Sequence, residues 1–339
     1  MTPGFSPNLP QATVVITAPV TQEFLDQACK HFHVLYLAEA VQVIEKYLPA
    51  ADCLIIRSEI RLDQHLLKLA PNLKLIGRLG VGVDNIDIVY CQQNAINIFY
   101  FPGVSARSVA ELGICLMINA ARRVVDGSLS LKNGAWRKAD LLGNELSDMT
   151  LGIIGYGHIG KQLAKIARPL FKCINVCKKH TSGFTRLSLW LRGITLASKV
   201  EILKNCDVIV LALPLTNETR FLIGADEIKF IKKHAILVNL SRQDIVRESD
   251  LVSVLENGDL IYCSDVTALK GNAFHEQPNT VLTPHLGAQT HQVRKRIEDE
   301  TLKILSAFFI EGSIKPEPSW FGKQFAIHHR AGRKQSRFI

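Results

Sequence analysis

The stretch TLGIIGYGHIGKQLAKIA, residues 150–167, decides the fold of this chain. Its first residues form a short apolar run typical of a buried strand, and its last residues repeat apolar side chains at helical spacing. Between them stand Gly155, Gly157 and Gly160 in G-x-G-x-x-G spacing. These glycines would permit a tight turn, a close approach of a pyrophosphate to the backbone, and close packing of the helix on the strand. We therefore predict a dinucleotide site at this strand-to-helix turn, where the helix N-terminus attracts anions.

Short β-rich runs alternate with amphipathic segments on both sides of this motif. Five runs precede it: TVVITA (13–18), HVLYL (33–37), CLIIR (53–57), KLIGRLG (74–80) and INIFY (96–100). Five follow its own strand: KCINVC (172–177), DVIVLALP (207–214), AILVNL (235–240), LIYCSDV (260–266) and TVLTPH (280–285). Such alternation is typical of parallel sheets with crossover helices. The predicted fold class is α/β, with two doubly wound parallel sheets.

Two long amphipathic segments should link the two series. SVAELGICLMINAARR, residues 108–123, is expected to form a helix capped by Ser105 or Ser108. Glu111 follows Ser108 by three residues, which is the spacing of a capping box. HQVRKRIEDETLKILSAFFIEG, residues 291–312, predicts a second helix that ends at its glycine.

Composition limits the class of protein. The chain has 339 residues, 47% of them hydrophobic and 21% charged, which indicates two well-packed globular domains. No apolar run reaches the roughly 20 residues that cross a bilayer, and the N-terminus lacks the basic and apolar segments of a secretory signal. We expect a cytoplasmic protein without a membrane partner.

Cysteines and charge exclude further classes. The eight cysteines are scattered, mostly in apolar runs and without a CxxC pair, so buried thiols are expected rather than disulfides or a metal site. The net charge is +9, but residues 315–339 hold six Lys or Arg against one Glu. No nucleic-acid partner is therefore predicted. The basic tail begins with spaced prolines and lacks periodicity, which indicates a loosely ordered extension.

The second strand after the glycines bears on the choice of cofactor. Sites specific for NAD usually carry an Asp or Glu about 20 residues beyond the glycines, where it binds the ribose hydroxyl. Here the region reads NVCKKHTSG, with Lys178, Lys179 and His180 at that place. These side chains suit the extra phosphate of NADP, through charge-assisted hydrogen bonds. We predict NADP as the preferred cofactor and NAD as the alternative, although a solvated basic loop would look the same.

Several further segments carry a family resemblance. They are RLGVGVDNID (78–87), PGVSARSVAELGICLMINAAR (102–122), NGAWRKADLLGNELSDMTLGIIGYGHIG (133–160), LALPLTNETRFLI (211–223), LVNLSRQDIVRESDLV (237–252) and LTPHLGAQT (282–290). In order and spacing they resemble the D-isomer-specific 2-hydroxyacid dehydrogenases, which include phosphoglycerate, glycerate and hydroxypyruvate enzymes. The resemblance spans about residues 12 to 312.

The resemblance implies a division into domains. Proteins of this family resemble two Rossmann-like or flavodoxin-like domains, with the cofactor domain inserted into the substrate domain. Carried over, residues 1–110 with 291–339 would form the substrate domain, and residues 111–290 the NAD(P)-binding Rossmann domain. A homodimer through the cofactor domain and its neighbouring long helices is expected by the same analogy.

The resemblance also implies the roles of individual residues. Arg242 would hold a substrate carboxylate in its planar fork, and His285 would be the acid/base, a task suited to imidazole at neutral pH. Arg57, Ser58, Val81 and Gly82 would meet the substrate. The implied cofactor-binding residues are Gly155, Tyr156, Gly157, His158, Ile159, Gly160, Lys178, Lys179, Leu213, Pro214, Thr219 and Asp265.

Two residues depart from the family pattern. Gln243 follows the arginine where the family has Gly, and Lys270 stands where the family has the glutamate that pairs with its histidine. Either His285 acts alone, or Glu276 or another group in the shortened loop substitutes for that glutamate. We expect an oxidoreductase that transfers a hydride between NAD(P)H and a small 2-keto acid or D-2-hydroxy acid, with activity reduced by the missing glutamate. A catalytically impaired NAD(P)-binding regulator resembling the C-terminal-binding corepressors, and a degenerate scaffold, stay open as alternatives.

Overall fold

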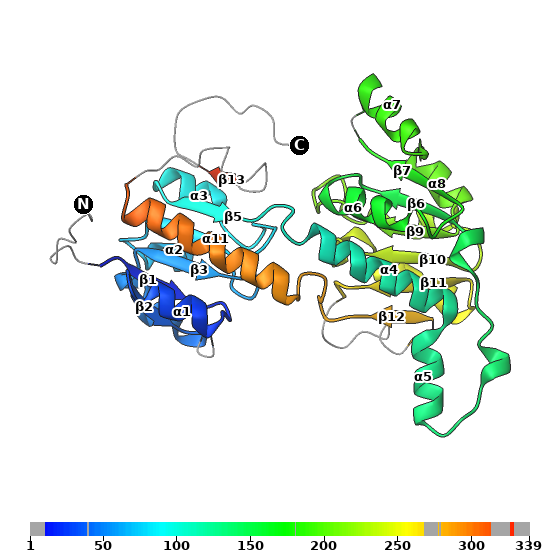
Figure 1. Cartoon of the computed structure of the whole chain (residues 1–339), viewed down its shortest axis with the longest axis horizontal. Helices are drawn as coiled ribbons and strands as arrows, with labels where there is room; N and C mark the ends of the chain where they lie inside the picture. The colour runs from blue at the N-terminus through cyan, green and yellow to red at the C-terminus, as the bar shows by residue number, and fades with distance from the viewer. Residues whose placement is uncertain are drawn as a thin grey trace. The chain divides into compact units, whose positions relative to one another are not determined.

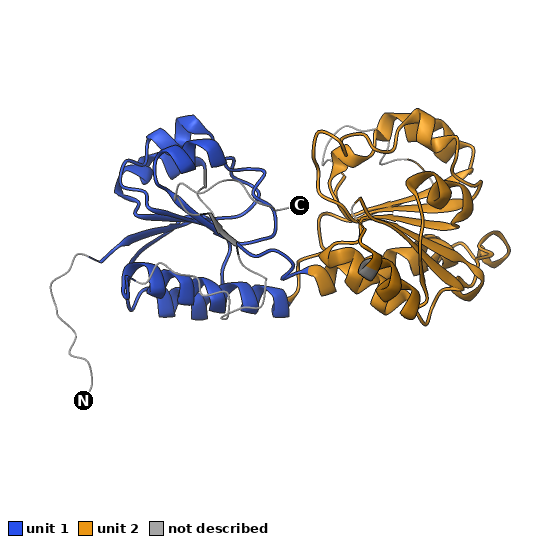
Figure 2. Cartoon of the chain, turned by 90° about the horizontal axis from the view of Figure 1, so that it is seen from above, with its two compact units in different colours: residues 1–105, 291–339 blue, residues 106–290 orange. Residues whose placement is uncertain are grey.

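The computed structural model describes residues 11–38, 41–179, 181–267, 277, 279–312 and 326–328. The chain divides into two compact units, which Figure 2 colours blue and orange. The first contains residues 1–105 and 291–339, and the second contains residues 106–290. In each unit helices cover both faces of a largely parallel sheet (Figures 1 and 2). The predicted α/β fold class is confirmed.

The sheet of the first unit has the strand order β13-β5-β4-β3-β1-β2. Its strands are β1 Thr13–Ile16, β2 His33–Tyr36, β3 Cys53–Ile56, β4 Leu75–Arg78, β5 Asn97–Tyr100 and β13 Ala326–His328. The first five are parallel, in the 2-1-3-4-5 order of flavodoxin-like sheets. Strand β13 pairs antiparallel with β5, so the expected loose tail is wrong for its three residues. Without it, β5 would be an edge strand with unpaired backbone groups.

Helices, several of them capped by side chains, complete the first unit. Its helical segments are α1 Gln22–Ala28, η1 Val41–Lys46, η2 Leu48–Ala50, α2 Gln64–Lys68, α3 Ile88–Gln93 and α11 His291–Phe309. Thr21, Asp63 and Asp87 cap α1, α2 and α3 by accepting backbone N–H bonds, as these residue types favour.

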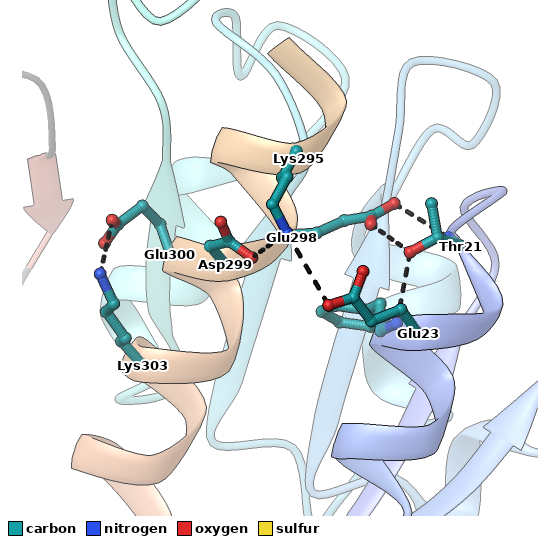
Figure 3. A network of polar contacts seen from close by, with 8 residues as sticks. Thr21, Glu23, Lys295, Glu298, Asp299, Glu300 and Lys303 are labelled. Atoms are coloured by element: carbon teal, nitrogen blue, oxygen red, sulfur yellow. Dashed lines mark hydrogen bonds and ion pairs between the residues drawn. The ribbon is translucent and has the colours of Figure 1, made fainter. Parts of the chain in front are cut away.

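A buried carboxylate joins the last described helix of the first unit to its first one (Figure 3). Glu298 on α11 accepts hydrogen bonds from the Thr21 N–H, at 3.0 Å, and from the Thr21 hydroxyl, at 2.5 Å. Nearby, the Lys295 ammonium lies 3.8 Å from Glu23 and 3.6 Å from Asp299. Bonds to a charged group contribute about 1.5–3 kcal/mol each. Since Thr21 caps α1, this contact fixes α11 within the first unit despite the long separation in sequence.

The sheet of the second unit is parallel throughout, in the order β12-β11-β10-β9-β6-β7-β8. Its strands are β6 Thr150–Ile154, β7 Cys173–Cys177, β8 Ile194–Leu196, β9 Val208–Leu211, β10 Ala235–Asn239, β11 Leu260–Ser264 and β12 Thr280–Leu282. The chain winds outward from β6 on one side and from β9 on the other. The direction of winding therefore reverses between these two strands, where open α/β sheets bind ligands. Strand β8 was not predicted from the sequence.

The helical segments of the second unit cover both faces of this sheet. They are α4 Ala106–Arg122, α5 Val124–Lys132, η3 Lys138–Asp140, η4 Leu146–Asp148, α6 His158–Ala167, α7 Gly183–Leu191, α8 Lys199–Asn205, α9 Ala225–Ile228, η5 Gln243–Ile245, η6 Glu248–Leu251 and α10 Val252–Glu256. Along β9, Val208 and Val210 pack in the cluster that includes α4 and α6. Ile209 and Leu211 pack in a second cluster with α8. Strands buried on both faces read as continuous apolar runs, which explains the sharp sequence signal here.

The long linking helix α4 forms as predicted, but its predicted capping box does not. The helix begins at Ala106, so Ser108 lies inside it, and the Ser108 hydroxyl donates to the Gly287 carbonyl at 2.8 Å. Glu111 instead pairs with Arg107 at 2.6 Å. The Ser108 hydroxyl thus donates to a carbonyl far away in the sequence, where the spacing had suggested that it would accept from the Glu111 N–H. Within the described part of the chain, no helix combines the length and the apolar character that crossing a membrane requires.

Candidate functional site

The glycine turn after β6 has the geometry that its spacing predicts. Gly155 has φ +103°, and a Cβ there would lie 2.3 Å from the Ala212 carbonyl oxygen, so only glycine fits. A Cβ on Gly160 would lie 2.1 Å from the Gly155 carbonyl oxygen, so α6 packs tightly against the turn. Among the described residues, no atom lies within 4 Å of a Cβ built on Gly157, the N-cap of α6. This open backbone at a helix N-terminus fits a pyrophosphate.

The sequence-predicted residues of the second unit lie at one edge of its sheet. All its strands are parallel, so the segments that follow them share the carboxyl edge. The glycine turn follows β6, Lys178 and Lys179 follow β7, Leu213 and Pro214 follow β9, Arg242 follows β10, Asp265 follows β11 and His285 follows β12. Thr219 shapes the loop after β9, because its hydroxyl donates to the Pro214 carbonyl at 2.7 Å. Cofactor contacts by these residues stay predictions.

The basic residues at the end of β7 meet a carboxylate from another loop, which the sequence did not reveal. Lys178 and Lys179 are exposed, as expected for a basic loop, and His180 lies outside the described residues. Lys179, however, is ion-paired with Glu218 from the loop after β9. Both side chains are more than half exposed, so the pair contributes only about 0–1 kcal/mol and can exchange for another anion.

A second carboxylate, Asp265, holds the turn that contains His285. Asp265 is buried at 4% exposure. Its Oδ1 accepts from the Thr283 hydroxyl at 2.6 Å and from the Leu286 N–H at 2.7 Å, and its Oδ2 accepts from the Gly287 N–H at 2.8 Å. His285 lies within this turn at φ +58°, an uncommon conformation for a residue with a side chain. The exit of β11 therefore imposes the backbone conformation of His285.

Helix α4 supports the same turn from another side. The Ser108 hydroxyl donates to the Gly287 carbonyl, and a Cβ on Gly287 would lie 3.0 Å from both Asp265 Oδ2 and Val109 Cγ2. Sequence reasoning assigned Asp265 to the cofactor and missed its bonds to the turn. Lys270 stands where the family has the glutamate that pairs with the histidine, and Glu276 is a candidate substitute for it. Both lie outside the described residues.

The turn of Arg242 after β10 is held by its neighbours. The Asn239 amide donates to the Arg242 carbonyl at 2.9 Å, and its oxygen accepts from the Ser241 N–H at 3.0 Å. The Ser241 hydroxyl donates to the Leu211 carbonyl and accepts from the Leu213 N–H, at 2.9 and 3.0 Å. These bonds join the Arg242 turn to the loop after β9.

Gln243, the departure from the family pattern, contacts a buried carboxylate. Its amide donates to Glu248 Oε2 at 3.1 Å, and Glu248 is 6% exposed. The Tyr262 and Thr267 hydroxyls each donate to Glu248 Oε1 at 3.4 Å. Burial, and secondarily the charge of Glu248, raises the pKa of Tyr262 well above its ordinary value. Sequence reasoning missed Glu248, because an acid at the start of a helical turn resembles an ordinary surface residue.

The remaining predicted residues lie in the first unit, after two neighbouring strands. Arg57 and Ser58 follow β3, while Val81 and Gly82 belong to the loop after β4. These loops share one edge of the sheet, since β3 and β4 are parallel. The Asn85 amide joins them by donating to the Arg57 carbonyl at 2.9 Å. Substrate contacts by these four residues stay predictions.

The chain is similar to known proteins over most of its length. The family described as "D-isomer specific 2-hydroxyacid dehydrogenase, NAD binding domain" matches residues 114–287. The D-3-phosphoglycerate dehydrogenase of Methanocaldococcus jannaschii is 35% identical over 288 residues, which cover 80% of this chain and 53% of that protein. This chain therefore spans about half the length of that relative.

Two further known proteins match this chain over most of its length and over most of their own length. The glyoxylate reductase of Thermococcus litoralis is 33% identical over 282 residues, which cover 78% of this chain and 82% of that protein. The crystal structure of D-lactate dehydrogenase from Aquifex aeolicus, complexed with NAD and lactic acid, superposes with a TM-score of 0.79. Its sequence is 26% identical, and the match covers 89% of this chain and 96% of that one.

Proposed function

Because the chain belongs to the D-isomer-specific 2-hydroxyacid dehydrogenase family, we propose that it transfers a hydride between NAD(P)H and a small 2-keto acid or D-2-hydroxy acid. What supports this is the second unit's carboxyl edge, which carries the glycine turn together with the turns of Arg242 and His285. Each of these two turns is fixed by buried polar side chains. Preorganised groups of this kind are what catalysis requires.

In the proposed reaction the chain binds, orients and protonates, and a bound nicotinamide supplies the hydride. The Arg242 guanidinium holds the carboxylate of the keto acid in a planar fork. The His285 imidazolium donates a proton to the keto oxygen and takes it back in the reverse reaction. The first unit acts as the substrate domain, with Arg57, Ser58, Val81 and Gly82 completing the substrate contacts. The second unit acts as the NAD(P)-binding domain.

We propose a preference for NADP over NAD. What supports it is the end of β7, where Lys178 and Lys179 replace the acid that binds the ribose hydroxyl in NAD-specific sites. The pair between Lys179 and Glu218 is exposed, so a phosphate can displace Glu218.

Activity and cofactor preference are testable in one experiment. The purified protein is titrated with NADPH and NADH by fluorescence, and a panel of 2-keto acids that includes glyoxylate and hydroxypyruvate is then assayed with each cofactor. We expect roughly tenfold tighter binding of NADPH, from charge-assisted bonds to its extra phosphate, and slow reduction of a short keto acid. Equal affinities would disprove the preference. Tight cofactor binding without any turnover would instead favour a regulator resembling the C-terminal-binding corepressors.

We also propose a homodimer formed through the second unit. The segment from α5 to η4 exposes large apolar side chains, among them Leu129, Leu131, Trp136 and Leu142, at 52%, 60%, 80% and 90% exposure. Exposed apolar residues in such number on one segment indicate an interaction surface.

Sedimentation measures the assembly directly. At micromolar concentration we expect about twice the chain mass of 37.7 kDa for the native protein, and a shift towards the monomer for Leu129→Asp. The reason is that a buried unpaired carboxylate costs several kcal/mol. Ser128→Asp, at an exposed position on the same helix, is the control for the charge alone. A native protein that sediments as a monomer would refute the dimer.

A further inference from the structure

We propose that Glu248 is a positioning residue for Arg242, acting through Gln243. The idea rests on the proposed function, because it assigns a role to Glu248 in binding the substrate carboxylate. The observation that motivates it is a buried carboxylate that accepts from three side chains, one of which is the direct chain neighbour of Arg242.

The hydrogen bonds form a closed ring around the peptide that follows Arg242. The Asn239 amide donates to the Arg242 carbonyl at 2.9 Å and to the Tyr262 hydroxyl at 3.4 Å. Tyr262 donates to Glu248 Oε1, and Gln243 donates to Glu248 Oε2. The ring thus leaves the main chain at the Arg242 carbonyl and returns to it at Gln243.

Burial makes this ring rigid. Asn239 and Tyr262 are fully buried and Glu248 nearly so, whereas Gln243 is only partly buried. Hydrogen bonds in such surroundings are stronger than in water, and leaving one of these polar groups without its partner is costly. The direction of the Arg242 side chain depends on the backbone dihedral angles that this ring fixes. A guanidinium held in place in advance loses less freedom when it binds a carboxylate.

Glu248 also reaches the exit of β11. It accepts from Thr267, two residues after Asp265, and Asp265 holds the His285 turn. The two carboxylates therefore have parallel tasks, Asp265 at the His285 turn and Glu248 at the Arg242 turn. The glutamine that departs from the family pattern is the side chain that connects Glu248 to the arginine.

The test compares Gln243→Ala, Glu248→Leu and Glu248→Gln, with Ser249→Ala as the control on the same helical turn. The first two break the link. In Glu248→Gln the Gln243 amide can turn over and accept from the new amide, so this variant should rescue the ring. We expect the KM for the keto acid to rise on the order of tenfold in Gln243→Ala and Glu248→Leu, the loss associated with a bond to a charged group. KM should stay within about twofold of native in Glu248→Gln and Ser249→Ala. Cofactor affinity and kcat should change little.

A second readout does not depend on turnover. Phenylglyoxal modifies arginine, and peptide mass mapping gives its rate at Arg242 in each variant. We expect a severalfold change of that rate in Gln243→Ala and in Glu248→Leu, and the native rate in Glu248→Gln and in the control. The double variant Gln243→Ala with Glu248→Leu should be no worse than either single change, because both act through one contact.

Native KM and native modification rates in folded Gln243→Ala and Glu248→Leu would overturn the proposal, as would fully additive effects in the double variant. If the native protein reduces no keto acid, the proposed function fails. The modification rates then decide on Glu248 alone: a change confined to the two link-breaking variants supports the ring, and equal rates refute it.

Discussion

His285→Ala should lower kcat for keto-acid reduction by about 10²–10⁴-fold, the contribution typical of a positioned general acid. The imidazole is the group on the β12 turn that can pass a proton at neutral pH, and Asp265 holds the backbone around it. Removing the imidazole should therefore leave the fold and the affinity for the reduced cofactor unchanged. Steady-state kinetics and fluorescence titration measure the two quantities separately.

The pH profile distinguishes a proton donor from a residue that only shapes the site. Reduction of a keto acid consumes a proton, so the native rate should fall as the pH rises. His285→Ala should have a low rate with a nearly flat profile. His65→Ala, an exposed histidine on α2, is the matched control and should behave like the native protein. A residual rate above a tenth of the native one, with the native pH dependence, would remove His285 from the mechanism.

Local patterns predicted the fold because its signals are short in range. The glycine turn is specified by three closely spaced glycines, of which Gly155 and Gly160 leave no room for a Cβ, and the buried strands read as continuous apolar runs. Strand β8 and the hydrogen bond of Ser108 escaped prediction for the opposite reason. Ile194–Leu196 is ordered by pairing with β7, and Ser108 by a carbonyl 179 residues away. Neither partner is visible from the local sequence.

The site could be predicted only in part. The strand-end positions of Arg242, His285 and the lysines followed from motif order, because parallel strands bring such positions to one edge. The carboxylates that organise these positions did not follow. Asp265 was predicted as a cofactor contact, which stays a prediction, but its hydrogen bonds to donors of the His285 turn were missed, and Glu248 was overlooked. The sequence indicates which side chains do chemistry, but the side chains that hold them depend on contacts between distant segments.

Asp265→Ala is the second large effect that we expect. The change removes the acceptors of the Thr283 hydroxyl and of the Leu286 and Gly287 N–H groups, two of which belong to the main chain. Unpaired buried donors cost about 1–3 kcal/mol each. Because the bonds of Thr283 and Leu286 are only partly buried and water can replace them in part, the free energy of unfolding should fall by about 2–4 kcal/mol in urea denaturation. The His285 turn should relax from its φ of +58°. A displacement of about 1 Å can cost a hundredfold in rate, and we expect a loss of kcat of that order.

Two milder variants separate support of the turn from contact with the cofactor. Asp265→Asn retains an oxygen for Thr283 and Leu286 but presents an amide to the Gly287 N–H, and Thr283→Val removes only the hydroxyl bond. If Asp265 acts by holding the turn, kcat and stability should fall together, in the order Thr283→Val, Asp265→Asn, Asp265→Ala, while the Kd for the reduced cofactor changes little. If Asp265 acts mainly as a cofactor ligand, Asp265→Ala should weaken that Kd and recover near-native kcat at saturating cofactor, and Thr283→Val should have no effect. The second pattern would show that Asp265 does not hold the His285 turn. It would then contradict the role that the three short hydrogen bonds of Asp265 indicate.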